Sequence, residues 1–155
     1  MMNIVLYQPD IPQNTGNIAR TCALTNTRLH LIKPLGFSLE EKYVRRAGLD
    51  YWDLLDLQVY ENWQEFLEKN PDADIFISTT HAKHFYSEVE YPEDAYLLFG
   101  KETAGLPDEI HEAYPDRRFR IPMKNHERAR SLNLSNSVNI VLFEALRQHG
   151  FPGLV

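Results

Sequence analysis

Residues 117–138 place cationic, hydroxyl and amide side chains between two apolar segments, a composition suited to binding or catalysis. The stretch reads RRFRIPMKNHERARSLNLSNSV. Polar groups in such a loop are costly to bury unless they find hydrogen-bond partners. Either the loop is a solvated turn, or its donors line a preorganised pocket and face a ligand. The residues of the loop alone leave both interpretations open.

The glycine-rich segment 100–107, GKETAGLP, superficially resembles a phosphate-binding loop. In a nucleoside triphosphate site, Lys and then Ser or Thr follow the second glycine directly, because they must reach the terminal phosphates and the magnesium ion. Here Leu106 and Pro107 follow it, and no G-x-G-x-x-G pattern follows the first predicted strand. Tight-turn geometry explains both glycines. It does not explain Glu102, an acid held between them.

Histidine and cysteine provide little evidence for catalysis or metal binding. His81 and His84 are three residues apart, but no third ligand stands at a matching spacing, so we predict no metal site. Cys22 lies on the apolar face of a predicted helix, which indicates a core thiol rather than a nucleophile. A single cysteine also excludes an intrachain disulfide framework and is typical of a reducing cytoplasm.

Arg20 lies in a predicted helix that opens with Asn14-Thr15-Gly16-Asn17, where Asn14 or Thr15 is suited to cap the N-terminus. Main-chain amides at a helix N-terminus bind phosphate oxygens well, so this junction suits phosphate or ribose contacts. Composition alone favours the simpler interpretation of Arg20, which is a surface arginine with a solvated head group.

Charge is distributed unevenly along the chain. The net charge of −6 by itself argues against a nucleic-acid partner. However, residues 50–94 contain twelve acidic and two basic residues, whereas residues 117–130 contain six basic residues and one acidic residue. Lys42, Arg45 and Arg46 form a second basic cluster. This asymmetry is consistent with one cationic face, and equally with scattered solvated charges.

Apolar runs and turn residues predict the elements that must position these groups. Strands are expected at 3–7, 28–32, 57–60, 74–79, 95–99 and 118–121. A first helix is expected to follow a cap at Asn14 or Thr15 and to end at 24. Further helices are expected at 38–46, 61–68, 108–113 and 134–149, and Gly150 is expected to close the last one. This alternation predicts an α/β fold with a mostly parallel sheet flanked by helices. Ligands of such sheets bind outside the carboxyl ends of the strands, so the polar junctions after Tyr7, Phe99 and Ile121 are expected to converge.

Length and composition predict one domain over residues 1–155. The 43% apolar and 25% charged fractions are ordinary for a soluble globular protein. No apolar run approaches the ~18 residues of a membrane span. The N-terminal MMNIVLYQP lacks the charged segment and cleavage site of a signal peptide. We therefore expect a cytoplasmic protein.

Three ordered segments together resemble the motifs of the SpoU-type ribose methyltransferases, within the SPOUT superfamily. The segments are 14–20 (NTGNIAR), 98–107 (LFGKETAGLP), and 121–123 with 131–138 (IPM and SLNLSNSV). The likeness runs from Asn3 to about Gly153. The sequence around the motifs, including IVLYQPDIPQNTGN and RRAGLDY, is similar to the smallest branch of the family, the tRNA wobble-position cytidine/uridine 2′-O-methyltransferases.

The resemblance implies an α/β SPOUT fold with a C-terminal trefoil knot, S-adenosylmethionine as methyl donor, and a homodimer that methylates the anticodon stem-loop of tRNA. By position it assigns catalysis to Arg20, supported by Asn14. The implied cofactor-binding residues are Ser78, Thr79, Gly100, Glu102, Ile121, Ser131 and Leu132. The implied RNA-binding residues are Lys42, Arg45, Arg46, Lys124, Arg128, Arg130, Ser135 and Asn136. The cationic members should make RNA binding salt-dependent.

On this expectation Arg20 binds the adjacent phosphate and stabilises the developing alkoxide, because a guanidinium stays protonated and is a poor base. It would act as the general base only if its pKa were strongly depressed. Two positions depart from the branch, since Ala104 stands where arginine is usual and Phe143 where tyrosine is common. Two other functional classes are alternatives. A non-catalytic RNA- or nucleotide-binding module of the same fold is disfavoured by the intact Arg20, Glu102 and 131–136 segment. A metal- or nucleotide-dependent hydrolase is disfavoured by the missing ligands and phosphate loop.

Overall fold

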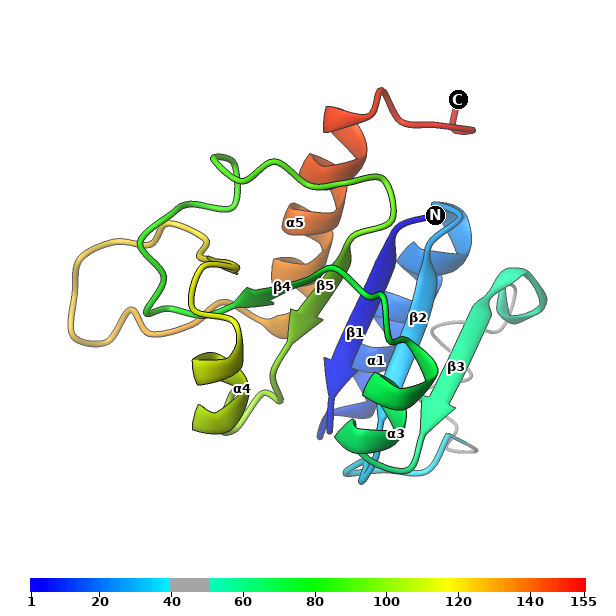
Figure 1. The fold of residues 1–155 in the computed structure, drawn as a ribbon, viewed down its shortest axis with the longest axis horizontal. Coiled ribbons are helices and arrows are strands. Elements are labelled where there is room, and N and C mark those ends of the chain that lie inside the picture. The colour runs from blue at the N-terminus through cyan, green and yellow to red at the C-terminus, as the bar shows by residue number, and fades with distance from the viewer. Residues whose placement is uncertain (40–50) are drawn as a thin grey trace.

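A computed structural model, which describes residues 1–39 and 51–155, contains one parallel sheet (Figure 1). Its strands are β1 (Asn3–Tyr7), β2 (Arg28–Ile32), β3 (Asp56–Tyr60), β4 (Ile75–Ser78), β5 (Tyr96–Phe99) and β6 (Arg118–Phe119). The strand order is β3-β2-β1-β5-β4-β6, and every neighbouring pair runs parallel. The prediction of a mostly parallel α/β fold is therefore confirmed.

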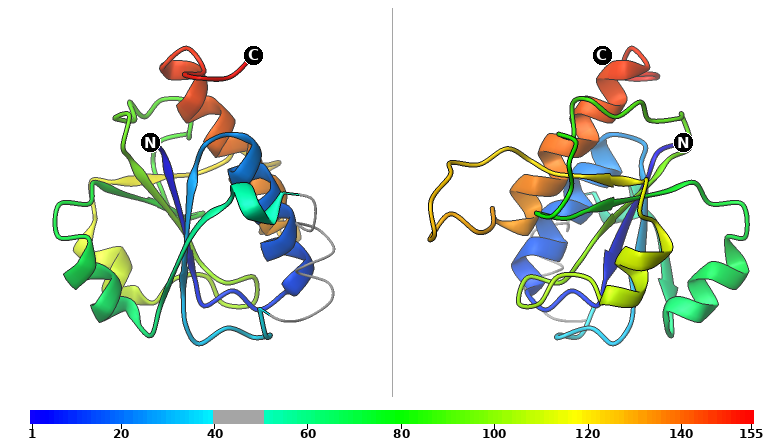
Figure 2. Two further views of the ribbon diagram at one scale, coloured as in Figure 1. Left: turned by 90° about the vertical axis from the view of Figure 1, so that its right-hand side faces the viewer. Right: turned by 60° about the vertical axis from the view of Figure 1, so that its left-hand side comes forward.

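Helices cover both faces of this sheet (Figure 2). The helices are α1 (Pro12–Leu24), α3 (Trp63–Lys69), α4 (Asp108–Ala113) and α5 (Leu134–Gln148), with a short 3₁₀ helix, η1 (Trp52–Leu54). Helices α1 and α5 pack against each other on one face, and α3 and α4 lie on the other. None of the helices in the described ranges is long and apolar enough to cross a membrane.

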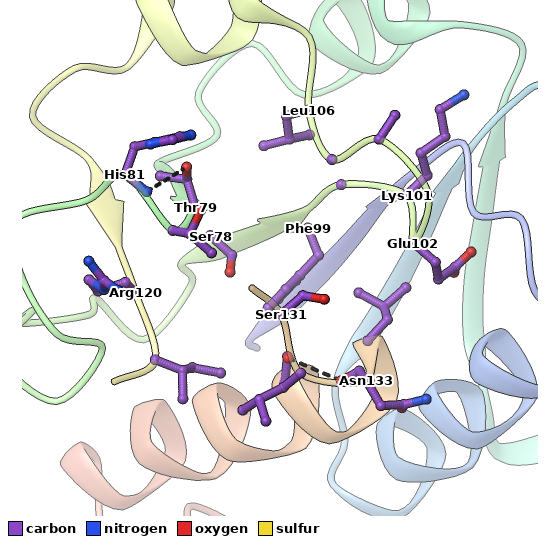
Figure 3. Close-up of a pocket in the computed structure, with 18 of the residues that line it drawn as sticks. Ser78, Thr79, His81, Phe99, Lys101, Glu102, Leu106, Arg120, Ser131 and Asn133 are labelled. Atoms are coloured by element: carbon purple, nitrogen blue, oxygen red, sulfur yellow. Dashed lines mark hydrogen bonds between the residues drawn. The ribbon is translucent and has the colours of Figure 1, made fainter. Parts of the chain in front are cut away.

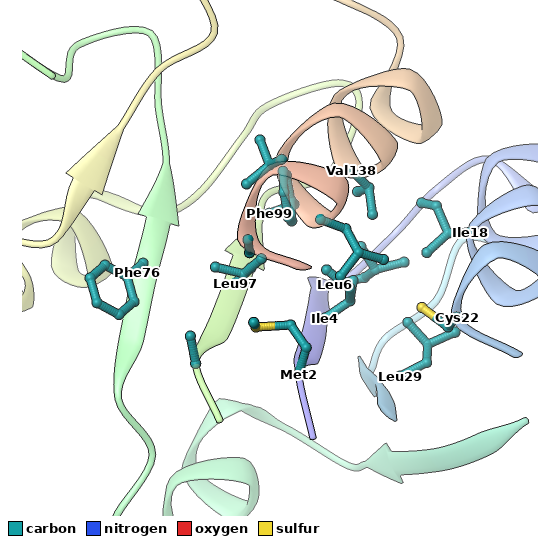
Figure 4. Close-up of a cluster of buried hydrophobic side chains, with 14 of the residues drawn as sticks. Met2, Ile4, Leu6, Ile18, Cys22, Leu29, Phe76, Leu97, Phe99 and Val138 are labelled. Carbon is teal, nitrogen blue, oxygen red and sulfur yellow. The ribbon is translucent and has the colours of Figure 1, made fainter. Parts of the chain in front are cut away.

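The central strands are apolar on both faces because both faces are covered. Ile4 and Leu6 of β1 point toward α1 and α5, whereas Val5 points toward α3 and α4. On the first face, α1 contributes Ile18 and Cys22 to the core (Figure 4). Cys22 is fully buried, and burial raises the pKa of its thiol, so the prediction of a core cysteine is confirmed.

A hydrogen-bonded polar cluster lies within the core on the α3 face. It consists of Asn3, His30, Tyr60, Asn70 and Tyr96, and we call it the His30 cluster. The amide oxygen of Asn3 is 2.9 Å from His30 Nε2, and the hydroxyl of Tyr60 is 2.8 Å from His30 Nδ1. Because the amide oxygen only accepts, Nε2 carries the proton and Nδ1 accepts from Tyr60. Asn70 in turn donates to the Tyr60 hydroxyl and accepts from Tyr96.

His30 is neutral in this environment. Its side chain is completely buried, and its pKa is lowered to about 4. The main cause is burial, followed by the positive charge of Arg28, while the charge of Asp56 acts in the opposite direction. A neutral imidazole donates at one nitrogen and accepts at the other, which is the arrangement that Asn3 and Tyr60 require.

Most predicted boundaries are right within about two residues, but the start of α1 was wrong. The prediction had Asn14 or Thr15 capping the helix, whereas α1 begins at Pro12 and both residues are buried inside it. Proline suits the first helical turn, where its missing N–H is not needed. At the other end of the chain, Gly150 follows α5 with a φ of +72°, as a helix-closing glycine should. The helix predicted at 38–46 lies almost entirely outside the described residues.

Candidate functional site

A cavity of about 470 Å³ opens at the carboxyl ends of β4, β5 and β6 (Figure 3). Its walls come from residues 78–81, 99–102, 104–106, 120–121, 123, 131–134 and 137, together with Ile11, Asn14 and His111. The segments after β1, β5 and β6 therefore meet at one site, as the sheet topology predicted. The loop after β4 completes it.

All seven residues expected to bind the cofactor lie on the wall of this cavity. They are Ser78, Thr79, Gly100, Glu102, Ile121, Ser131 and Leu132. They come from four segments that are distant in sequence, and the fold brings them together. Their role in binding stays a prediction.

The loop after β5 is a tight turn that requires glycine at both ends. Gly105 has a φ of +68° and donates from its main-chain nitrogen to the Lys101 carbonyl, 2.9 Å away. A Cβ atom at Gly100 would lie 2.3 Å from the carbonyl carbon of Gly105. Because that atom belongs to the main chain, no side-chain movement could relieve the clash. The turn thus brings main-chain atoms close enough together to form one wall of the cavity.

Glu102 connects this loop to the segment before α1 through hydrogen bonds. Its Oε2 accepts hydrogen bonds from the main-chain nitrogens of Asp10 and Ile11, at 2.8 and 3.0 Å. Thr103 adds a 2.6 Å hydrogen bond from its hydroxyl to the Asp10 carboxylate. The second oxygen of Glu102, Oε1, is buried and has no hydrogen-bond partner among the described residues. A buried carboxylate oxygen without a partner is unusual in a native protein and calls for an explanation.

Asn133 links the third motif to the first, and the prediction missed it. Its amide nitrogen donates to Asn14 Oδ1 at 3.1 Å. Its amide oxygen caps α5 by accepting from the main-chain nitrogens of Ser135 and Asn136. The spacing Asn-Leu-Ser-Asn before an apolar helix is an N-cap signal that could have identified it. The NH₂ group of Asn14 makes no hydrogen bond within the described part of the chain and remains available at the cavity.

The RNA contact expected at Ser135 stays a prediction. Ser135 is buried, and its hydroxyl donates to Asn133 Oδ1 at 2.6 Å. Its hydroxyl therefore supports the helix cap. Asn136, the next residue, is exposed.

Arg20 does not line the cavity that contains Asn14. It lies on the outer face of α1, with its guanidinium carbon 4.8 Å from the centre of the Tyr51 ring and one nitrogen 3.4 Å from the Tyr51 hydroxyl. Residues six positions apart in a helix point in different directions, and Arg20 faces Tyr51 instead of the cavity that Asn14 lines.

The remaining cationic side chains of the predicted RNA surface lie on the loop between β6 and α5, which extends away from the sheet (Figure 2). Lys124, Arg128 and Arg130 are all exposed there. The second predicted cluster, Lys42, Arg45 and Arg46, lies outside the described residues. His81 lines the cavity, as does Arg120, which the prediction did not single out. No group of three metal-binding side chains is found in the ranges 1–39 and 51–155.

Comparison with known proteins places this geometry in context. Residues 1–143 match the model of the SpoU rRNA Methylase family. The whole chain aligns with the whole tRNA (cytidine(34)-2′-O)-methyltransferase of Methylovorus glucosotrophus, and the two sequences are 51% identical. It is 48% identical over 99% of its length to 97% of the Yersinia pestis protein of the same name.

Two solved structures extend the comparison. One, described as giving structural insights into the 2-OH methylation of C/U34 on tRNA, has a TM-score of 0.91 and 42% identity, with 97% of both chains covered. The other is an AdoMet-bound rRNA methyltransferase from Sinorhizobium meliloti, with a TM-score of 0.84 and 25% identity. That similarity covers 94% of this chain and 56% of the other.

Proposed function

The chain belongs to the SpoU methylase family, and from this membership we propose that it methylates the ribose 2′-hydroxyl of the wobble nucleotide, position 34, in tRNA. The observation that carries the proposal is the cavity at the carboxyl ends of β4, β5 and β6, where three family motifs meet. Relatives about half identical over the whole chain bear the name of this reaction. We place the enzyme in the cytoplasm, with its tRNA substrate.

The cavity suits S-adenosylmethionine, which would supply an electrophilic methyl group. Ser78, Thr79, Ile121, Ser131 and Leu132 would hold it, in part through main-chain groups. The close turn at Gly100 keeps that wall free of side-chain bulk. The orphaned Oε1 of Glu102 would offer an acceptor on the wall nearest the start of α1. This pairing of an apolar floor with a few unsatisfied polar atoms is typical of small-molecule sites.

Asn14 and Arg20 act on the RNA. The free NH₂ group of Asn14, whose orientation is held by Asn133, would donate to the ribose of the substrate. Arg20 would bind the adjacent phosphate and stabilise negative charge on the 2′-oxygen. A guanidinium is suited to this because it stays protonated and forms paired hydrogen bonds with phosphate oxygens.

A homodimer would complete the site, because Arg20 faces away from the cavity of its own chain. Helices α1 and α5 also expose large apolar side chains: Leu24 is 48% exposed, Ile140 37% and Phe143 45%. Burying such groups against a second chain is favourable. We therefore place the interface on α1 and α5. We also propose that the loops after β4, β5 and β6 are threaded as the trefoil knot of the SPOUT fold.

Methylation of tRNA in vitro tests the function. Purified protein and S-adenosylmethionine carrying a labelled methyl group are added to tRNA from cells that lack the wobble methylation, and the methylated nucleotide is located by mass spectrometry. We expect 2′-O-methylation at position 34. Arg20→Ala should lower turnover at least about a hundredfold, as loss of an electrostatic stabiliser does, while cofactor affinity is retained. Methylation at another position, or full activity of the variant, would contradict the proposal.

The dimer is tested by light scattering after size-exclusion chromatography. Phe143→Glu should shift the protein to a monomer, because it places a charge in the apolar interface. Phe85→Glu is the matched control, since Phe85 is 43% exposed but lies on the loop after β4. A dimer that persists in Phe143→Glu would move the interface elsewhere.

A further inference from the structure

One wall of the cavity carries two basic side chains that form no ion pair among the described residues. His81 follows β4 and Arg120 follows β6, and both line the cavity. Neither forms an ion pair within the described parts of the chain. By contrast, Arg117, three residues before Arg120, is paired with Asp74 at 2.6 Å. Arg117 therefore lies outside the cavity and is neutralised by an acid, whereas Arg120 lines the cavity and has no ion-pair partner among the described residues.

Arg120 is held firmly in this position. Its main-chain nitrogen donates to the His84 carbonyl at 2.9 Å, and its carbonyl accepts from the Tyr86 nitrogen at 2.8 Å. Its side-chain Nε is buried and has no hydrogen-bond partner in the described ranges. A buried guanidinium N–H without a partner is unfavourable, so such a group in a native protein calls for an explanation. A ligand acceptor at Arg120 provides one.

Neighbouring groups make this wall more positive. Arg118 donates to the main-chain carbonyl of His111, and its Nε is also buried without a partner among the described residues. The pKa of His111 is lowered, first by burial and then by the charge of Arg118, with a smaller effect of His81 in the same direction. Asp108 opposes these effects. Arg118 therefore adds a positive charge beside this wall, and Asp108 adds a negative one.

The opposite wall has the opposite character. Figure 3 shows His81 and Arg120 on one side of the cavity and Glu102 on the other. The orphaned Oε1 of Glu102 is on that second wall. Lys101 is next to Glu102, but its side chain points away from the centre of the cavity. A ligand in the cavity would therefore lie between an anionic and a cationic wall.

We propose that Arg120, assisted by His81, binds the carboxylate at the amino-acid end of the cofactor. The inference rests on the proposed function, in which S-adenosylmethionine occupies this cavity. That molecule has one carboxylate, and a guanidinium binds a carboxylate through two parallel hydrogen bonds. The cationic wall would thereby orient the cofactor within the cavity, with its carboxylate away from Glu102.

A phosphate of the RNA is a weaker candidate for this subsite. Arg120 is only partly exposed and its Nε is buried, whereas Lys124, Arg128 and Arg130 are exposed on the neighbouring loop. A macromolecular phosphate would meet those exposed cations first. A small carboxylate can enter the cavity and reach Arg120.

Calorimetry with two ligands tests the subsite. S-Adenosylhomocysteine retains the carboxylate, and decarboxylated S-adenosylhomocysteine differs by that group alone. We expect Arg120→Gln to weaken binding of the first ligand about tenfold or more, as loss of a charged hydrogen-bonded pair does, and to leave the second unchanged. Arg120→Lys should recover part of the loss. Arg117→Gln is the matched control and should leave both affinities unchanged.

Each other outcome overturns the inference in a distinct way. Equal losses for the two ligands would show that Arg120 only supports the fold. Unchanged ligand affinities with weaker tRNA binding would assign Arg120 to an RNA phosphate. If Arg120→Gln does not fold, the wild-type protein decides, because equal affinity for the two ligands excludes a carboxylate subsite. Failure of the wild type to bind S-adenosylhomocysteine at all would instead overturn the proposed function.

Discussion

Two regions of the molecule that bury polar groups differ in how those groups are satisfied, the His30 cluster under α3 and the cavity at the carboxyl ends of β4, β5 and β6. In the His30 cluster, side-chain donors and acceptors are matched from Asn3 to Tyr96. In the cavity, Glu102 Oε1 and Arg120 Nε are buried without partners in the described ranges. A satisfied buried network stabilises and specifies a core, whereas unsatisfied groups are tolerated where a ligand completes them. We therefore assign stability to the first region and ligand binding to the second.

Of the substitutions that would distinguish the ligand-binding region from the structural one, Gly100→Ala is expected to have the largest effect, a loss of ligand affinity. The added Cβ would meet main-chain atoms of Gly105, so the turn must open and the cavity wall must move. We expect affinity for S-adenosylhomocysteine to fall more than about a hundredfold by calorimetry. Gly150→Ala is the control, because Gly150 lies after α5 and outside the cavity, and a Cβ there meets open space and costs only about 1–2 kcal/mol of backbone strain. Normal affinity in Gly100→Ala would show that this wall does not contact the ligand.

The second expected effect is a loss of folding stability at acid pH, caused by His30. Unfolded histidine binds a proton below pH ~6.5, whereas folded His30 remains neutral down to about pH 4. Between these values the unfolded state holds more protons, so stability is complete above pH ~6.5 and falls as the pH is lowered toward 4. The expected loss of unfolding free energy is about 3 kcal/mol, measured by urea denaturation at several pH values.

A variant identifies the source of that acid sensitivity. His30→Gln should be less stable at neutral pH but should lose the steep dependence between pH 6.5 and 4, because the titrating group is gone. His84→Gln, at an exposed position, should keep it. If His30→Gln retains the wild-type pH dependence, another group is responsible.

The smallest effect, a moderate loss of turnover, is expected from Glu102→Gln. The amide oxygen can replace Oε2 as acceptor for the Asp10 and Ile11 nitrogens, so the loop stays attached to α1. The orphaned Oε1 is replaced by a donor, which removes the acceptor at the cavity. We expect turnover to fall about tenfold, the equivalent of one charged hydrogen bond, while thermal stability changes little. An equally large drop in stability would place Glu102 with the His30 cluster as a structural group.

Much of the fold could be predicted because its signals are local. The apolar runs of β1, β2 and β5 identify buried strands, and Gly150 marks the end of α5. Their alternation with helices is enough to predict a parallel sheet and to locate ligand binding at its carboxyl edge. The motifs themselves then identify the residues that line the cavity.

The errors came from contacts between distant segments. No side chain near α1 caps its N-terminus, because Glu102, about ninety residues later, accepts from the main-chain nitrogens of Asp10 and Ile11. The local signal therefore predicted a cap at Asn14 or Thr15, whereas the helix begins at Pro12.

The sequence by itself determined the strands and helices, the uneven distribution of charge and the family motifs, because each depends on residues close together in the chain. The tertiary structure decided which groups meet across the cavity. It separated Arg20 from Asn14 and joined Asn14 to Asn133. It also placed an unpaired Arg120 opposite Glu102. These arrangements depend on distances between segments far apart in the chain. The packing of α1 against α5 and the turns after β4, β5 and β6 set those distances.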